Sequence, residues 1–584
     1  MGQIIPILFK PGIQKDGSDF QGEYCTDSQW VRFVNKMPQS MRGIVSIPTS
    51  ELDTSIDYGN VRTFASIDGY VFFSTLLNAT NGSFRIYQIE KENGAQIFAD
   101  KAIGVRGNFS VTQIFPFFTP DEKKFIAFYV TENDFNDKSF LKGTRPACVF
   151  LLEYGKKINE LKGPFILKAG KIKNPQSPNE PLSEQQELEL ENPQPSVFQD
   201  QGFAGDGGVI FSAPYLFFYG SDGHIFWTRG EAFANTFIEN INPKPLLIPG
   251  KILEKPIAIS NEKIVYGALT RGGATTPTII FWTTNSVIKF SNSGELTDSK
   301  KGYSIKFNVQ VITTEISILS NKCVVNFNGV FYWVGKGIFY TYSGVVDILK
   351  NTMNQQFFHD NVDYNNAFKI FAVKYPTRHE IWWFYPTKDS GGECKNAIIY
   401  NVQDDVWYNT KIDAQSSVVD SNGDFLTYGL PISNNGINIR AFWKLETGIG
   451  QLDTRTLATK DNFIKIDSYF VTPWVSYATF NNFKQPVGTK KFMQVKQIEP
   501  NFVITQINNN IDNSKMYVQI LGKNFAGSQT IESEKITFKK NHEYISISSF
   551  QARNIAFKFG IEDTDLAFKA GVSFFEADEG DGQV

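Results

Sequence analysis

The sequence predicts an all-β protein made of many short strands. Of its 584 residues, 53 are phenylalanine and 23 are tyrosine, and aromatic residues form 15% of the chain. Aromatic and β-branched side chains favour pleated, half-buried surfaces. Helical periodicity is scarce, whereas short aromatic or β-branched runs bounded by turn residues recur, for example at 84–89, 125–130, 264–269 and 536–539.

A repeated hairpin pattern indicates how these strands are arranged. An Asp-Gly pair at 68–69 and at 222–223, and an Asn-Gly pair at 328–329, each lead directly into aromatic residues. Each copy predicts a tight turn followed by an inner strand. A Gly-Lys-Gly turn at 335–337 comes directly after the third copy. Two consecutive tight reversals predict a four-stranded meander sheet, as in a propeller blade.

These observations predict a propeller with a second β domain. The copies are spaced too irregularly for a regular array, so we predict a degenerate β-propeller core, the alternative being the hairpins of a β-sandwich. We expect an N-terminal arm at 1–58 that leads into the first blade, blades at 59–456, and a C-terminal β-sandwich-like or platform domain at 457–584. Prolines and glutamates crowd the stretch at about 170–208, which predicts an exposed, poorly ordered acidic insertion.

Composition and charge exclude several classes of function. The net charge is −3, so the chain lacks the concentrated lysine and arginine surface with which proteins grip nucleic acid. The four cysteines lie far apart, which argues against a zinc site or a disulfide framework and fits assembly in a reducing cytoplasm. No apolar run is long enough for a membrane helix, so we expect no membrane segment. We also expect no targeting peptide.

Candidate catalytic residues are few. None of the four histidines has a second histidine or a cysteine at metal-ligand spacing. His379 and Glu380 begin a zincin-like motif, but position 383 is tryptophan and the surrounding residues are typical of a strand. The chain has no nucleophile elbow, phosphate-binding loop or dinucleotide fingerprint. We therefore expect a protein that is not an enzyme and has no cofactor and no metal.

Carboxylates leave two alternatives open. A pair of acids for glycoside hydrolysis could come from Asp53, Asp57, Asp404 or Asp405, although nothing singles out a pair. Asp-Gly stretches, such as the one at 16–19, could hold calcium, but they lack the full ligand ladder of a calcium loop, and tight turns explain them better.

Two aromatic runs, at 331–333 and 382–385, leave a third alternative. Exposed rings could stack on sugars. Alternate residues of a strand point to opposite faces and pack between blades, so we expect these side chains to form core.

The residues that suggest a family lie near the start of the chain. Trp30, Arg32 and Phe33 belong to a Trp-Val-Arg-Phe run, which is followed by Pro38 and then by Gly43. With this opening the chain resembles the packaged-DNA stabilisation, tail-hub and tail-nozzle proteins of short-tailed, podovirus-type phages. Their sequences carry a similar run, then a proline, then a glycine before the first blade.

The resemblance continues along most of the chain in the same order, at 332–338, 380–386, 400–407 and 497–502. At 551–554, the arginine- and glycine-rich stretch of the family is thinned to Gln-Ala-Arg-Asn, so we expect the architecture to transfer better than the contacts. The resemblance gives structural rather than catalytic roles to Trp30, Arg32, Phe33, Gly43, Trp333, Gly335, Trp382, Trp383, Tyr385, Trp407 and Pro500.

Physical chemistry suggests roles for the first of these residues. Trp30 and Phe33 can anchor the N-terminal arm in an apolar groove. Arg32 is available for a carboxylate of another subunit. Gly43 permits a turn that bulkier residues would strain.

The resemblance implies a virion protein of the tail at the portal vertex. It implies a homo-oligomeric, sixfold ring below the portal and the head-to-tail adaptor, which continues the DNA channel, closes it until ejection and anchors tail fibres. Contact with the packaged double-stranded DNA would be transient and non-specific. The rival hypotheses are a receptor-binding tail fibre or spike and a tail-associated glycan hydrolase on a propeller.

Overall fold

In the computed structural model, the chain is almost entirely β. The structure describes residues 3–18, 20, 22–41, 43–46, 61–67, 69–78, 83–92, 95–103, 109–118, 124–132, 148–166, 207–212, 215–220, 223–229, 257–270, 278–299, 302–434, 437–447, 451–452, 463–464, 466–476, 491–506, 515–539, 542–561 and 566–581. Within these ranges the predicted fold class is confirmed, because strands form nearly all of the regular structure.

Seven meander sheets follow one another between residues 61 and 445 of the described chain. The first three are antiparallel. The first sheet consists of β8 (Val61–Ile67), β9 (Tyr70–Asn78), β10 (Ser83–Glu92) and β11 (Ala95–Ile103), and the second of β12 (Phe109–Phe118), β13 (Lys124–Glu132), β14 (Cys148–Glu153) and β15 (Lys162–Ile166). The third consists of β16 (Gly208–Ser212), β17 (Tyr215–Tyr219), β18 (His224–Arg229) and β19 (Ile257–Ala258).

The next three sheets are β20 (Ile264–Leu269), β21 (Thr278–Thr283), β22 (Ser286–Ser299) and β23 (Gly302–Thr314); β24 (Val325–Phe327), β25 (Val330–Val334), β26 (Phe339–Tyr342) and β27 (Val346–Leu349); and β28 (Phe371–Tyr375), β29 (Glu380–Pro386), β30 (Cys394–Asn401) and β31 (Val406–Lys411). The seventh consists of β32 (Ser416–Val419), β33 (Phe425–Asn434), β34 (Ile437–Leu445) and the N-terminal β7 (Ile44–Ser46), with β35 (Gln451–Leu452) and β36 (Phe463–Ile464) beyond it.

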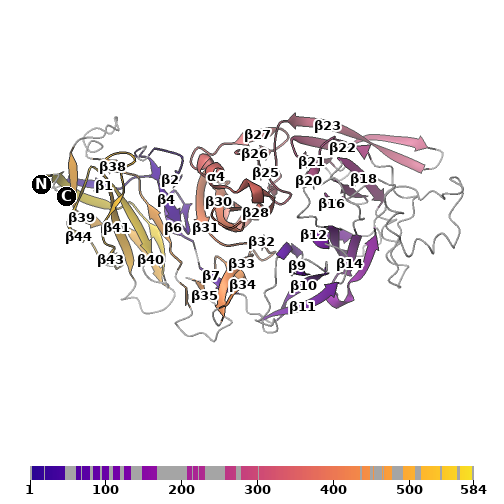
Figure 1. The fold of residues 1–584 in the computed structure, drawn as a ribbon, viewed down its shortest axis with the longest axis horizontal. Coiled ribbons are helices and arrows are strands. Elements are labelled where there is room, and N and C mark those ends of the chain that lie inside the picture. Colours follow the sequence, from indigo (N-terminus) through magenta and orange to yellow (C-terminus); the bar gives the residue numbers. More distant parts are fainter. Residues whose placement is uncertain are drawn as a thin grey trace.

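Aromatic packing between neighbouring sheets closes these seven into a ring, the arrangement of a β-propeller (Figure 1). The last and first sheets meet through Phe442 and Phe73, whose ring centroids lie 4.4 Å apart. Trp382 of the sixth sheet packs edge-on against Phe425 of the seventh. Each interface buries large rings, which supplies most of the favourable free energy of such a fold.

The predicted tight turns are confirmed, and the strands after them are inner strands of their four-stranded sheets, as expected. Gly69, Gly223 and Gly329 lie in two- to four-residue connections between antiparallel strands. Asn328 and Gly329 both have positive φ, 53° and 92°, as a type I′ turn requires. The strands that follow are the second or third of their sheets, whereas the first strands, such as β8 and β32, face the next sheet at the centre.

The aromatic runs form core, as predicted. Every residue of β29 is buried. Trp382 and Phe384 pack toward the seventh sheet, whereas Trp383 and Tyr385 pack toward the fifth. This alternation is the two-residue period of a strand that is covered on both faces.

Three further sheets form the C-terminal β domain, which packs as a sandwich-like body at the other end of the molecule (Figure 1). Its C-terminal strands are β37 (Tyr469–Val471), β38 (Val475–Ser476), β39 (Phe492–Glu499), β40 (Phe502–Gln506), β41 (Met516–Lys523), β42 (Ile531–Glu532), β43 (Ile536–Phe538), β44 (Ile545–Ala552), β45 (Asn554–Ile561), β46 (Leu566–Ala570) and β47 (Phe574–Gly580).

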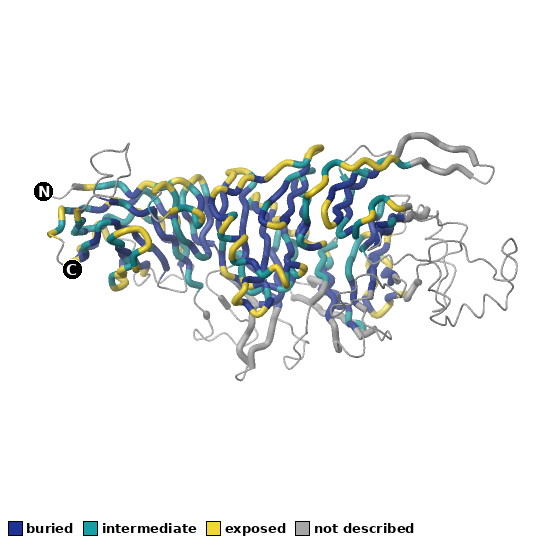
Figure 2. Tube along the Cα trace, turned by 45° about the horizontal axis from the view of Figure 1, so that its top comes forward, coloured by how far each residue is buried: buried dark blue, intermediate teal, exposed yellow. Residues whose placement is uncertain are grey.

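The N-terminal residues do not form a separate arm, in contrast to the boundary at 58 drawn from the sequence. They pair with C-terminal strands and complete the domain at the far end of the chain. Buried segments run without a break from this domain into the propeller (Figure 2). The N-terminal strands are β1 (Gln3–Pro6), β2 (Lys10–Ile13), β3 (Tyr24–Cys25), β4 (Asp27–Gln29), β5 (Val31–Val34) and β6 (Met37–Ser40).

Among the described residues, helices are few and short. They are α4 (Gln355–Asn361) and the 3-10 turns η1 (Ile158–Glu160), η3 (Tyr364–Lys369) and η4 (Pro376–Arg378). No helix of the described ranges is long and apolar enough to cross a membrane. The predicted acidic insertion lies outside the described residues, except for its last two positions, Gly207 and Gly208.

Candidate functional site

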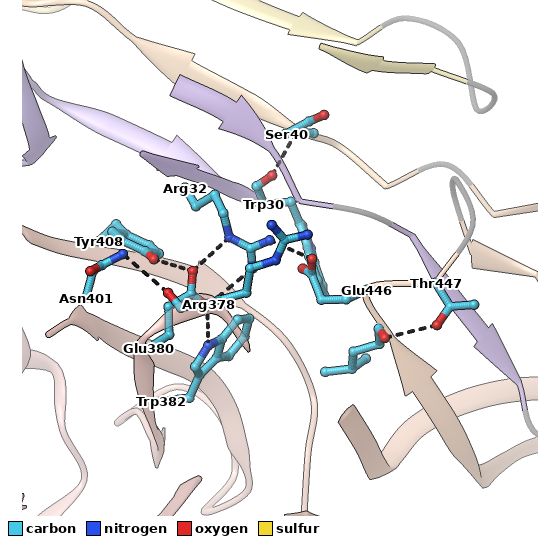
Figure 3. A network of polar contacts seen from close by, with 12 residues as sticks. Trp30, Arg32, Ser40, Arg378, Glu380, Trp382, Asn401, Tyr408, Glu446 and Thr447 are labelled. Atoms are coloured by element: carbon cyan, nitrogen blue, oxygen red, sulfur yellow. Dashed lines mark hydrogen bonds and ion pairs between the residues drawn. The ribbon is translucent and has the colours of Figure 1, made fainter. Parts of the chain in front are cut away.

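The most distinctive polar site lies where the C-terminal domain meets the propeller. Arg32 on β5 enters this junction from the N-terminal segment, Glu380 is the first residue of β29, and Glu446 follows β34. The three side chains are at most 3% exposed. Figure 3 shows the guanidinium between the two carboxylates.

Arg32 makes three charge-assisted hydrogen bonds. Its Nε donates to Oε1 of Glu380 at 2.8 Å and its Nη2 donates to Oε2 of the same carboxylate at 3.2 Å. Its Nη1 donates to Oε2 of Glu446 at 2.6 Å. The contact with Glu380 is therefore bidentate, which fixes both distance and orientation.

Two aromatic donors complete the coordination of Glu380. Tyr408 donates its hydroxyl to Oε1 at 2.5 Å, and the indole nitrogen of Trp382 donates to Oε2 at 2.8 Å. Each carboxylate oxygen of Glu380 therefore accepts two hydrogen bonds. Glu446 is less well satisfied, because its buried Oε1 has no hydrogen-bond partner among the described residues.

The electrostatics keep Arg32 charged and Tyr408 protonated. Burial alone would lower the pKa of Arg32, but the carboxylates of Glu380 and Glu446 outweigh it and raise that pKa well above its ordinary value. Burial and the adjacent Glu380 carboxylate raise the pKa of Tyr408, so its hydroxyl stays protonated as a donor. The site consequently holds a permanent cation between two buried carboxylate groups. Such an arrangement suits a structural link between elements better than proton transfer.

Trp30 and Phe33 flank this network. The Trp30 backbone, at φ 54°, accepts hydrogen bonds at its carbonyl from the amide of Met41 at 2.8 Å and the hydroxyl of Ser468 at 2.9 Å. Its amide donates to the hydroxyl of Thr410 at 3.2 Å. The ring of Phe33 lies 6.3 Å from that of Tyr408. Both anchors are buried within the same chain.

The role expected of Arg32 is corrected by this geometry. We expected it to pair with a carboxylate of another subunit, but both of its partners belong to its own chain. A guanidinium that is 2% exposed has no surface to offer a neighbour. Gly43 is also close to the network, since its carbonyl accepts a hydrogen bond from the amide of Thr447.

The remaining residues singled out from the sequence lie in other places. Trp383, Tyr385, Trp333 and Trp407 form the aromatic core between the fourth, fifth and sixth sheets, and the Trp407 indole donates to the carbonyl of Lys350. Gly335 lies in the β25–β26 turn, and Pro500 lies between β39 and β40. The junction therefore gathers Trp30, Arg32, Phe33 and Trp382, with Gly43 nearby.

Sequence reasoning missed Glu446 and Tyr408, and it considered Glu380 in a rejected zinc motif and as the first residue of the family-like segment 380–386, not as the partner of a buried cation. The available signal was a charged residue inside an otherwise apolar strand. Arg32 follows Val31 and precedes Phe33, and such a buried charge requires a partner.

Of the other candidate acids, Asp404 and Asp405 lie within the described residues. Asp405 accepts a hydrogen bond from the Tyr400 hydroxyl at 3.0 Å in the β30–β31 turn, beside Asp404. Asp53 and Asp57 lie outside the described residues. Across the described ranges, no three His, Cys, Asp or Glu side chains are grouped to hold a metal ion.

Asp16, considered for calcium, has a structural contact instead. Its carboxylate accepts hydrogen bonds from the backbone amides of Gln356 and Phe357 at 2.7 and 2.6 Å. These amides belong to the first turn of α4, where helical N–H groups lack partners within the helix.

Comparisons with known proteins give only remote structural likenesses. No protein-family model and no curated protein sequence matches the chain. A puromycin hydrolase is 9% identical, with a TM-score of 0.36 over 74% of this chain and 62% of its own. An ancestral GH74 enzyme is 9% identical, with a TM-score of 0.36 over 72% of this chain and 50% of its own.

The computationally designed Ika8 protein is similar at the same remote level. It is 10% identical, with a TM-score of 0.32 over 69% of this chain and 99% of its own. This chain thus spans about three fifths of the puromycin hydrolase and half of the GH74 enzyme. At these identities and TM-scores, the likenesses do not bear on what the protein does.

Proposed function

We propose that the protein is a structural, non-enzymatic virion protein that forms the tail hub or nozzle of a short-tailed phage. In this role, six copies form a ring below the portal and adaptor. The ring extends the DNA channel, retains the packaged DNA until ejection and anchors tail fibres.

One observation carries the proposal. The residues of the opening run that resembles tail-hub proteins, Trp30, Arg32 and Phe33, meet Trp382 of a later matching segment in one buried junction. Arg32 and Glu380, which are 348 positions apart in the sequence, are joined by a buried, charge-assisted hydrogen bond. A sequence segment that holds two domains together suits a protein with a structural role.

The charge of the chain also supports the proposal. A net charge of −3 over 584 residues gives little attraction for phosphates. A channel that must release DNA quickly should not hold it with many lysines or arginines. Steric closure and weak repulsion would retain the DNA.

The test is the copy number of this protein relative to the portal protein in purified virions, measured by quantitative mass spectrometry. Closed symmetry ties stoichiometry to location, so a hub of six copies below a twelvefold portal gives a ratio of about one half. A ratio above one would reject the hub in favour of peripheral fibres, and absence from the particle would reject a virion role altogether.

A further inference from the structure

We propose that residues 3–46 act as one closing strap, which couples closure of the propeller ring to completion of the C-terminal domain. Arg32 is the joint at which the two are fastened. This inference concerns how the chain opens and closes, and it does not depend on the proposed function.

The strap completes three sheets of the C-terminal domain. β1 pairs with β47, β4 pairs with β37, and β6 pairs with β46, all antiparallel. The partner β47 is the last strand of the described chain. These sheets therefore cannot be completed until strands more than 400 residues apart in the sequence have met.

The same segment then closes the propeller. β7 pairs antiparallel with β34, with Ser46 opposite Trp443, and it pairs parallel with β35. It is the fourth strand of the seventh sheet, whose first three strands come from the other end of the propeller sequence. Ring closure is therefore held by noncovalent contacts: the short pairing of β7 and a hydrophobic cluster that the first and seventh sheets share, in which Phe442 packs on Phe73.

Arg32 lies between these two sets of pairings and contacts both sides. It belongs to β5, which pairs with β6 in the C-terminal domain. Its two carboxylate partners lie on the sixth and seventh propeller sheets, Glu380 at the start of β29 and Glu446 directly after β34. The hydrogen bond from the Thr447 amide to the Gly43 carbonyl adds a second link next to β7.

Removal of the strap from one domain therefore leaves unpaired, buried charge in the other. Without the guanidinium, two carboxylates remain in a site that excludes water, which costs far more than the loss of an exposed ion pair. Dissociation of β7 from the seventh sheet and dissociation of β4 to β6 from the C-terminal domain are therefore expected to occur together. By reciprocity, whatever loosens the C-terminal sheets weakens closure of the ring, and the reverse also holds.

Amide hydrogen exchange on the full-length chain with Arg32→Met tests the coupling. We expect exchange about 100-fold faster both in β34 of the seventh sheet and in β37 and β47 of the C-terminal domain, with a smaller increase in β13 and β17. Faster exchange in the C-terminal strands alone would overturn the coupling. Unchanged exchange in both places would overturn the role of Arg32 as the joint.

Two further variants complete this test, one as an alternative to Arg32→Met and one as a control. Glu446→Gln keeps the shape of the side chain and one hydrogen-bond acceptor, so it serves if Arg32→Met does not fold; the same two regions should exchange faster, by about tenfold. Glu262→Gln is the matched control, because this acid is bonded only within the fourth sheet and its turn, to Thr283, Asn285 and Ser286. Exchange of β34 and β47 that is accelerated as much in this control as in Glu446→Gln would show that any lost carboxylate loosens them and would also overturn the proposal.

Discussion

At the scale of single residues, the junction depends on complete satisfaction of Glu380. Four donors from Arg32, Trp382 and Tyr408 surround its two oxygens. A buried carboxylate is tolerated only with such a set of partners. Each donor therefore contributes more than a hydrogen bond of the same length at the surface would.

Two tyrosines of the sixth sheet allow this difference to be measured. We expect Tyr408→Phe to lower the free energy of unfolding by about 1–3 kcal/mol, because one oxygen of Glu380 loses a donor that water cannot replace. Tyr400→Phe is the control, since its hydroxyl donates to Asp405 in a surface turn and its loss should cost less than about 1 kcal/mol. Urea unfolding followed by fluorescence gives both values, and equal losses would contradict the argument.

A second residue-scale prediction concerns acid. Burial alone would raise the pKa of Glu262, but hydrogen bonds from Thr283, Asn285 and Ser286 outweigh it and lower that pKa below 4.5. A lowered pKa in the folded state means that the stabilisation is present above pH 4.5. It is lost as the pH falls through the folded-state pKa.

Glu262→Gln should therefore reduce stability near pH 7, and this reduction should be smaller at pH 3, where more of the wild-type carboxyl is protonated. The measurement is the urea midpoint at pH 7 and at pH 3 for the variant and the wild type. A difference between them that is the same at both pH values would contradict this role of the ionised carboxylate.

At the scale of elements, the contact between β2 and the residues just before α4 is tight. Gly12 has a φ of 114°, and a Cβ placed there would lie 2.5 Å from Sδ of Met353. Gly12→Ala should lower the free energy of unfolding by about 1–3 kcal/mol through backbone strain and crowding. Gly155→Ala is the control, because Gly155 also has a positive φ, 77°, with open space around it. Thermal unfolding should show the larger loss for Gly12→Ala.

The carboxylate of Asp16 is predicted to stabilise α4. Its loss in Asp16→Ala removes two hydrogen bonds to the first-turn amides and a negative charge at the positive end of the helix, at a cost of about 1 kcal/mol. The exposed Ser18→Ala is the control and should have no measurable effect. The measurement is amide exchange within 355–361, and equal protection in both variants would exclude the cap.

Local sequence patterns were sufficient for some elements and not for others. The continuous aromatic run at 382–385 predicted that β29 is core, because burial on both faces leaves an uninterrupted apolar signature within a single strand. The Asn-Gly pair at 328–329 predicted its turn through the positive φ that both residues adopt. By contrast, the pairing of β7 with β34 joins segments almost 400 residues apart, and nothing in three residues specifies such a partner.

The same limit explains the candidate site. Arg32 in an apolar strand indicates that a buried partner must exist. It does not indicate which of the 60 acidic residues provides it. Glu446, 414 positions away, is placed only by the closed ring, so the network could be found only after the fold was known.

At the scale of the whole molecule, the shared core makes the two domains one folding unit. A single hydrophobic cluster contains Phe470 and Phe559 of the C-terminal domain together with Trp382 and Trp443 of the propeller. Independent domains bury little surface between them and unfold separately. A core that continues through the junction predicts one cooperative transition instead.

Buried thiols report on this cooperativity at two distant places. Cys25 lies in the N-terminal strands of the C-terminal domain and Cys323 in the propeller, and both are inaccessible in the fold. Burial raises the pKa of each, which disfavours the reactive thiolate. We expect both to resist alkylation in the native protein and to become reactive at the same urea concentration.

Mass-spectrometric mapping of the alkylated peptides across a urea series distinguishes the two cases. Coincident transitions at Cys25 and Cys323 are expected because the strap and the shared core join their surroundings. If Cys25 became reactive at a lower urea concentration than Cys323, the C-terminal domain would open while the propeller stayed closed. The continuity of the core would then not be enough to make the two domains unfold together, and the junction at Arg32 would be a contact between separate units.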